Sequence, residues 1–188
     1  MRTVLLTSAL ILSALAAVLS SSPAMSQSVP NAAPWDQPFL PPAPAWDGAS
    51  RALLLDVVRT NAGYFAVGER GHVLVSEDGQ AWTQAKVPTR ATLTTIATAD
   101  GVLWAAGHDG VIVHSTDGGQ NWTRRRAAPW RLDLADPSEG VPVMDLLFTD
   151  GKNGFAIGAY SLMLVTSDGG VTWTPRTVSS AAPVAAAE

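Results

Sequence analysis

The chain has 188 residues, of which 47% are hydrophobic and 15% charged, with no cysteine and a formal net charge of -4. This composition predicts one globular domain and excludes a disordered polymer, disulfide frameworks, thiolate metal sites and thiol nucleophiles. The acidic balance also argues against a nucleic-acid binder, because such a protein neutralises phosphates with a basic surface.

Residues 1–26 have the features of a secretory signal peptide. Arg2 precedes an apolar run over residues 4–19, and the small residues Ala24 and Ser26 stand where signal peptidase requires them for a cut after residue 26. The run is short for a bilayer-spanning helix, and an uncleaved anchor is the alternative. We expect a periplasmic or secreted protein with no membrane span after cleavage and no lipid anchor, since no cysteine follows the run.

Residues 27–50 form a proline-rich segment. Proline has no backbone N–H and cannot donate a hydrogen bond to a neighbouring strand, so we expect this segment to be a leader outside the domain. Its two Trp-Asp pairs, at Trp35 and Trp46, supply indoles that could lie across the domain as anchors. At the other end, residues 179–188 are rich in alanine and proline, which is typical of a flexible tail or a linker.

Between these ends the chain repeats one unit three times, over residues 51–89, 90–129 and 142–178, with an insertion at 130–141. Each unit has an apolar lead-in, a segment that ends in glycine, a β-branched segment, and a glycine turn followed by Trp-Thr. The short lengths and the β-branched residues favour strands over helices. Four short antiparallel strands in a repeat of this size predict the blade of an all-β, β-propeller-type fold.

The turn has the pattern Ser/Thr-x-Asp followed by glycine and Trp, and each residue type has a mechanical role. The aspartate can accept hydrogen bonds from the amides after it, the hydroxyl satisfies another group of the hairpin, and glycine adopts positive φ. The predicted turn residues are Ser76, Asp78, Gly79 and Trp82, then Ser115, Asp117, Gly119 and Trp122, then Thr166, Asp168, Gly170 and Trp173. The first turn is one residue shorter between Asp and Trp, so we expect it to be tighter or less regular.

These turns resemble the Asp-box, also called the BNR repeat, and the segments Phe65-Ala66-Val67-Gly68 and Phe155-Ala156-Ile157-Gly158 look most like the photosystem II stability/assembly-factor-like family. The resemblance covers roughly residues 53–178. It implies a non-catalytic, cofactor-free scaffold that holds assembly partners at a membrane surface. Members outside photosynthesis look like periplasmic accessory proteins, some of which accompany membrane exporters.

The number of blades raises a question, because propellers close with about four to eight blades. Three blades would leave apolar sheet faces and a strand edge open. We hypothesise that the chain is the front part of a longer propeller, and a homodimer that makes six blades is the alternative.

A different function class is a sialidase-like glycoside hydrolase or a carbohydrate-binding propeller, since sialidases also carry Asp-boxes. Such an enzyme needs an arginine cluster, a Tyr nucleophile with a Glu partner and an acid. The domain offers few candidates, namely Tyr64, Tyr160, Glu69, Glu77 and Glu139. We therefore predict no catalytic residue. We also predict no metal site, because His72, His108 and His114 occupy different positions of their units.

The one concentrated charge is Arg124-Arg125-Arg126, with Trp130 and Arg131 nearby. Arginines on an outermost strand protect its edge from pairing, and this is the favoured interpretation. The alternative is a partner-binding patch for an acidic protein loop or an anionic headgroup. The predicted partner is a protein, associated with a membrane, and not a nucleic acid.

Overall fold

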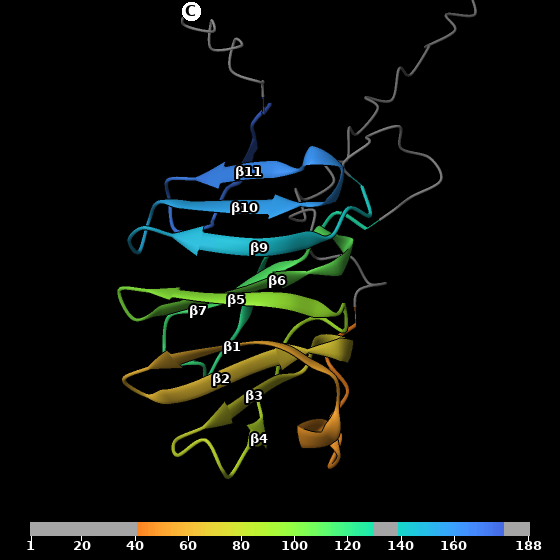
Figure 1. Ribbon diagram of the computed structural model, residues 1–188, viewed down its shortest axis with the longest axis vertical. Coiled ribbons are helices and arrows are strands. Elements are labelled where there is room, and N and C mark those ends of the chain that lie inside the picture. Colours follow the sequence, from red (N-terminus) through yellow and green to blue (C-terminus); the bar gives the residue numbers. More distant parts are fainter. Residues whose placement is uncertain (1–40, 130–138, 179–188) are drawn as a thin grey trace, which may run out of the picture. The chain divides into compact units, whose positions relative to one another are not determined.

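The computed structural model describes residues 41–129 and 139–178, and all structural statements refer to these residues (Figure 1). They form three four-stranded antiparallel sheets in which neighbours in sequence are neighbours in the sheet. The first sheet comprises β1 (Leu54–Thr60), β2 (Gly63–Gly68), β3 (Val73–Ser76) and β4 (Thr83–Gln84). The second comprises β5 (Leu93–Ala99), β6 (Val102–Gly107), β7 (Ile112–Ser115) and β8 (Thr123–Arg126). The third comprises β9 (Val143–Phe148), β10 (Gly154–Gly158), β11 (Met163–Thr166) and β12 (Thr174–Pro175).

The prediction of an all-β, propeller-type fold with three antiparallel blades is therefore confirmed, and the array is open. The pairing register repeats as well. Phe65 lies opposite Val75, Trp104 lies opposite His114, and Phe155 lies opposite Val165 in the three sheets.

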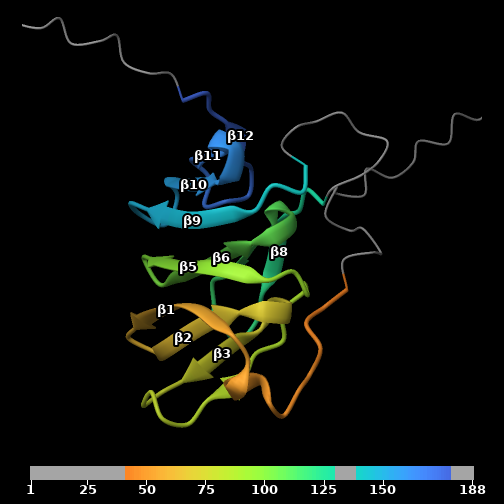
Figure 2. The ribbon, with the colours of Figure 1, turned by 45° about the vertical axis from the view of Figure 1, so that its right-hand side comes forward.

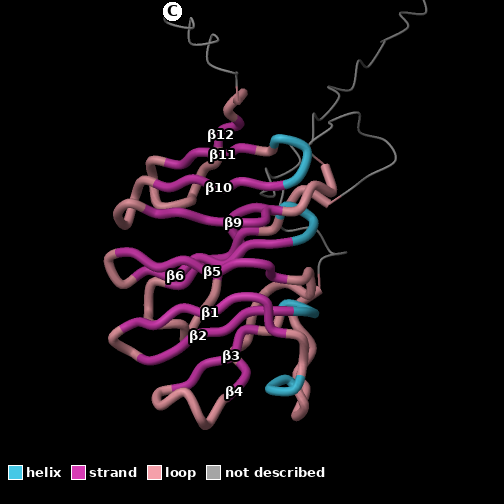
Figure 3. The backbone as a smooth tube through the Cα atoms, in the orientation of Figure 1, coloured by secondary structure: helices cyan, strands magenta, loops and turns pink. Residues whose placement is uncertain are grey.

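The turn between the second and third strands is also the same in each sheet. It is a three-residue 3-10 segment, seen as a short helix in Figure 3: η2 (Glu69–Gly71), η3 (His108–Gly110) and η4 (Ala159–Ser161). Its middle residue has a positive φ in all three copies, at Arg70, Asp109 and Tyr160. The repeat therefore includes a backbone conformation that the side chains at this position do not reveal.

The sheets pack face to face through two apolar cores (Figure 2). The first lies between the first and second sheets and includes Phe65 and Trp122, while the second lies between the second and third sheets and includes Trp104 and Phe148. The first strands β1, β5 and β9 are neighbours across the sheets. Hydrogen bonds join them: Asp56 Oδ2 accepts from the Ile96 amide at 2.8 Å.

Residues 43–51 lie on the far side of the first sheet. The Ala43 amide donates to the Val87 carbonyl at 3.0 Å, and the Trp46 amide donates to Gln84 Oε1 at 3.0 Å. The segment ends in η1 (Ala49–Arg51), where Ala49 is buried against Ala66 and Leu74. Part of the proline-rich segment thus covers the first sheet. Trp35 lies outside the described residues.

Candidate functional site

The hairpin that joins β7 to β8 shows how the predicted turn residues are used. Ser115 Oγ donates to Asp117 Oδ1 at 2.8 Å and accepts from the Gly119 amide at 2.9 Å. Asp117 accepts from the Asn121 amide at 2.9 Å and from Asn121 Nδ2 at 2.7 Å. Trp122 Nε1 closes the turn by donating to the Gly119 carbonyl at 3.1 Å. Each polar group therefore bonds within the hairpin itself.

The hairpin of the third sheet has the same bonds. Thr166 Oγ1 donates to Asp168 at 2.8 Å and accepts from the Gly170 amide at 2.9 Å, and Thr172 Oγ1 donates to Asp168 Oδ2 at 2.6 Å. Trp173 Nε1 donates to the Gly170 carbonyl at 3.1 Å.

The hairpin of the first sheet is one residue shorter and has a single positive-φ glycine, Gly79, where the other two hairpins have two. Ser76, Asp78 and Trp82 still make the corresponding bonds, at 3.1 Å for Ser76 Oγ to Asp78 and 3.2 Å for Trp82 Nε1 to the Gly79 carbonyl.

Hydrogen bonds keep these aspartates ionised. Donation by the Asn121 amide and side chain, followed by that of Ser115, lowers the pKa of Asp117 to about 2. Amide donors, above all that of Ala81, also lower the pKa of Asp78. A catalytic acid would need a raised pKa, so these carboxylates lack the electrostatics of a proton donor.

Each hairpin of the second and third sheets also contacts an aromatic side chain of the preceding sheet. A Cβ on Gly119 would collide with the ring of Phe65, which is fully buried. Trp104 Nε1 donates to the Gly169 carbonyl of the next hairpin at 2.9 Å, and its indole stacks on Phe148 with ring centroids 3.6 Å apart. The sequence interpretation missed this contact, although the shared position of Phe65, Trp104 and Phe155 in the repeat carries the signal.

The arginines of β8 bond to their surroundings and are half-buried. Arg124 donates to the Pro88 carbonyl at 2.8 Å, Arg126 donates to the Gly110 carbonyl at 2.6 Å, and Arg125 Nε donates to His114 Nε2 at 2.6 Å. The three residues lie on the outermost strand of the second sheet, as expected. Trp130 and Arg131 lie outside the described residues.

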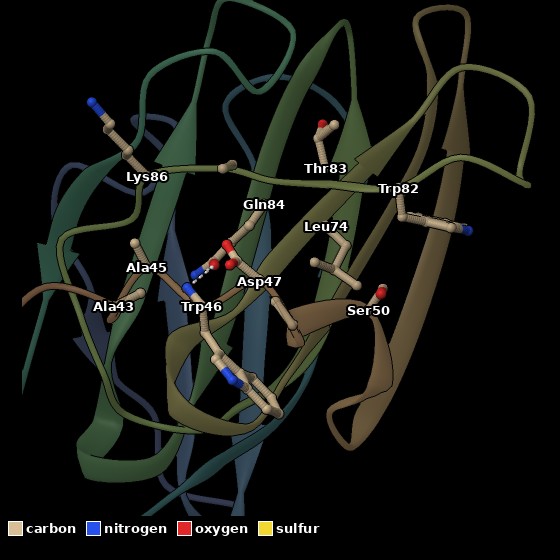
Figure 4. Close-up of a pocket in the computed structure, with 12 residues that line it drawn as sticks. Ala43, Ala45, Trp46, Asp47, Ser50, Leu74, Trp82, Thr83, Gln84 and Lys86 are labelled. Atoms are coloured by element: carbon tan, nitrogen blue, oxygen red, sulfur yellow. Dashed lines mark hydrogen bonds between the residues drawn. The ribbon is translucent and has the colours of Figure 1, made fainter.

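A groove of about 370 Å³ is lined both by residues 43–50 and by residues of the first sheet, among them Leu74 and Gln84 (Figure 4). Gln84 spans it by donating through Nε2 to the Pro44 carbonyl at 2.8 Å, and Lys86 lies at its rim. Trp46 also lines the groove. Its indole stacks on His72, with ring centroids 5.9 Å apart, and the Arg70 guanidinium lies 5.9 Å from the ring centroid. An aromatic ring beside cationic side chains suits an acidic or aromatic peptide side chain.

The structure does not bring the histidines together as a metal site. His72 is buried in the first sheet and His114 in the second, and no group of three or more metal-ligating side chains occurs within residues 41–129 and 139–178. Burial, followed by the charge of Arg125, lowers the pKa of His114 to about 4. In the same ranges no helix has the length and apolarity to cross a bilayer.

Three stacked antiparallel blades with repeated hairpins place this chain in the class of β-propeller proteins. The family model of the DUF6242 beta propeller domain matches residues 25–153, and the chain belongs to this family.

Two curated relatives are photosystem II assembly lipoproteins named Ycf48. The protein of Synechococcus sp. (strain CC9902) is 31% identical over 168 residues, which are 85% of this chain and 46% of the relative. The protein of Prochlorococcus marinus (strain NATL2A) is 46% identical over 50 residues, which are 27% of this chain and 14% of the relative. The chain thus spans less than half the length of these relatives.

Two solved structures share the fold. YCF48 bound to D1 peptide superposes with a TM-score of 0.53 at 20% identity, over 66% of this chain and 40% of that one. YCF48 from Cyanidioschyzon merolae gives a TM-score of 0.50 at 23% identity, over 71% of this chain and 39% of that one.

Proposed function

We propose that this chain is an exported, non-catalytic Asp-box propeller, periplasmic or secreted after signal cleavage, that binds a protein partner during the assembly or support of a membrane complex. The similarity to the Ycf48 assembly lipoproteins, one of whose structures contains a D1 peptide, carries this proposal. The hairpin geometry supports the non-catalytic part, because Asp78, Asp117 and Asp168 serve as acceptors within their own turns. If the chain acts outside photosynthesis, the membrane complex that it supports is an exporter in this proposal.

The surface that we propose for the partner is the arginine strand, residues 124–126, together with Trp130 and Arg131. Arg125 uses its Nε for His114, and its two Nη groups make no hydrogen bond to the described residues. A guanidinium whose two Nη groups are available can bind a carboxylate through two parallel hydrogen bonds. An acidic segment of a membrane-associated protein therefore fits this strand better than a basic one, in a chain whose net charge is -4.

A photo-crosslinking amino acid at Arg125 in the exported chain tests the surface directly. The matched control carries it at Arg59, an exposed arginine of β1 that lies over the Tyr64 ring at 5.6 Å. We expect one membrane-protein adduct from position 125 that is absent from position 59. We expect an excess of the unsubstituted chain to abolish this adduct in competition, and the Arg125→Glu chain to leave it. Equal adducts at both positions would overturn the arginine surface, and turnover of a fluorogenic sialoside would overturn the non-catalytic assignment.

A further inference from the structure

The outermost strand of the second sheet contains one residue more than its counterparts in the other two sheets. In each sheet the Thr after the hairpin Trp pairs with the same position of the third strand. The residue that pairs with the first position of the third strand lies two residues after this Thr in the first and third sheets, at Ala85 and Arg176. In the second sheet it lies three residues after, at Arg126. The extra residue is Arg125, at a register shift between β7 and β8, and a bulge of this kind redirects a side chain.

A second departure from the repeat lies directly beside the first. The position that is Val75 in β3 and Val165 in β11 is His114 in β7. Arg125 Nε donates to His114 Nε2 at 2.6 Å. An inserted arginine and a histidine in place of a valine therefore bind each other, and neither residue has a counterpart in the first or the third sheet.

His114 is held in place by its surroundings. It is 7% exposed and lies opposite Trp104, which is fully buried and donates to the Gly169 carbonyl of the third sheet. Burial, followed by the charge of Arg125, lowers the pKa of His114 to about 4, so the ring is neutral at neutral pH and can accept a hydrogen bond.

The direction of this hydrogen bond fixes the ring proton of His114. A guanidinium only donates, so Nε2 is the acceptor and the proton lies on Nδ1. Nδ1 is buried and has no hydrogen-bond partner among the described residues. A buried donor without a partner lowers stability, which indicates that the pair of His114 and Arg125 has a role other than stability.

Edge protection does not explain this pair. A charged side chain protects a strand edge from solvent, without a buried acceptor. Arg125 is instead half-buried and held through Nε. Its two Nη groups make no hydrogen bond to the described residues, so the pair presents two parallel N–H donors in a fixed direction.

We propose that His114 is a positioning residue, which fixes the Arg125 guanidinium so that its Nη1 and Nη2 bind one carboxylate of the protein partner. This role rests on the proposed function and assigns one contact within the arginine strand to particular atoms: the two Nη groups donate to the two carboxylate oxygens, while His114 holds Nε. A side chain that is already immobile loses less conformational entropy on binding. One long side chain held in this way raises affinity about two- to tenfold.

Fluorescence anisotropy of the exported chain with labelled hexaglutamate tests the role of His114, with hexaglutamine as the uncharged comparison and low salt to limit screening. We expect only hexaglutamate to bind. His114→Val installs the residue of the other two sheets and should weaken binding about two- to tenfold. His114→Gln, whose Oε1 can accept from Arg125, should restore it. The matched control Arg59→Gln removes an exposed arginine of β1 and should change the affinity by less than about twofold.

Deletion of Arg125 tests the inserted residue. The deletion gives β8 the register of β4 and β12, so we expect the chain to fold and hexaglutamate binding to fall at least as far as in His114→Val. If the deletion lowers the melting temperature, Arg125→Gln replaces it. His114→Val in the deletion chain should cause no further loss, because a positioning residue acts only through the residue that it holds.

Three results would overturn the positioning role: unchanged affinity in His114→Val, no restoration by His114→Gln, or a further loss when His114→Val is added to the deletion. A chain that binds hexaglutamate no better than hexaglutamine would overturn the carboxylate site itself.

Nitrogen-15 NMR examines the pair without any partner. We expect the neutral His114 ring to carry its proton on Nδ1, and the Arg125 Nε–H to exchange slowly with water in the unsubstituted chain and rapidly in His114→Val. A ring proton on Nε2 would overturn the proposal. The proposed function fails separately: equal crosslinked adducts at positions 125 and 59, beside the expected hexaglutamate and NMR results, would remove the membrane-protein partner and leave the carboxylate site.

Discussion

The aromatic residue at one position of the repeat has a different environment in each sheet, and truncation to alanine should reveal the difference. Phe65 and Trp104 are 0% exposed between sheets, and Phe155 is 38% exposed on the face of the third sheet that points away from the second. We expect Phe65→Ala and Trp104→Ala to lower the free energy of unfolding by ~3–5 kcal/mol each, the usual cost of removing a buried aromatic side chain.

The expected cost of Phe155→Ala is about 1 kcal/mol. Full burial of a phenylalanine contributes ~1.5–3 kcal/mol, Phe155 realises only part of it, and an open site leaves no enclosed cavity. For Trp104→Ala the cost lies in the upper half of its range, because the stacking on Phe148 and the bond to the Gly169 carbonyl are lost as well.

Urea unfolding followed by far-UV circular dichroism measures these differences without relying on the tryptophan that one variant removes. Equal losses for Phe155→Ala and Phe65→Ala would refute the reasoning, since Phe155 would then be as well packed as Phe65.

Gly119→Ala should lower the free energy of unfolding by ~2–4 kcal/mol, because Gly119 has a φ of 82° and an added Cβ would collide with Phe65. Gly118→Ala is the control: Gly118 has a φ of 70° and an added Cβ would meet no atom within 4 Å, so the expected loss in the same urea assay is ~1 kcal/mol. The pKa of Asp117 is about 2 in the folded chain and ordinarily near 3.8, so the ionised carboxylate contributes to stability above pH 3.8, and this contribution is lost as the pH falls from 3.8 to 2. Asp117→Asn should therefore reduce the slope of the free energy of unfolding against pH in this range. An unchanged slope would contradict the assignment. The pKa of His114 is lowered from 6.5 to about 4, so the unfolded chain takes up the proton first and the free energy of unfolding decreases as the pH falls between these values; His114→Gln should remove this decrease in melts recorded across the range.

The strands were predictable because the same pattern of apolar residues and glycines occurs in three units of the sequence. Each element has a local cause in the sequence. β-branched residues favour the strands, while glycines with positive φ and side-chain acceptors favour the hairpins. The sequence indicated that the Trp46 indole could lie across the domain, but the partners of two contacts distant in sequence were not predictable. Trp46 stacks on His72, and Gln84 binds the carbonyl of Pro44, although proline-rich composition alone indicates only an absence of strands.

The same reasoning explains why the arginine strand gave two interpretations. A run of arginines on an outermost strand protects the edge whether or not it binds a partner. The structure adds that Arg124 and Arg126 donate to carbonyls of Pro88 and Gly110, so part of their role is to satisfy backbone groups between strands. Charge pattern alone cannot distinguish a buried acceptor from a partner's carboxylate, since both take the same N–H donors.

The repeat also limits where function can lie. Residues that recur in all three sheets are already used for turns and for sheet-to-sheet contact, so they cannot distinguish one surface from another. Residues that differ between copies can. The position after the hairpin Thr is Gln84 in the first sheet, where it binds the segment over residues 43–51, Arg124 in the second and Pro175 in the third. A partner that recognises one blade must therefore contact this outer strand and its neighbours, and variants there should change binding while the hairpin bonds remain intact.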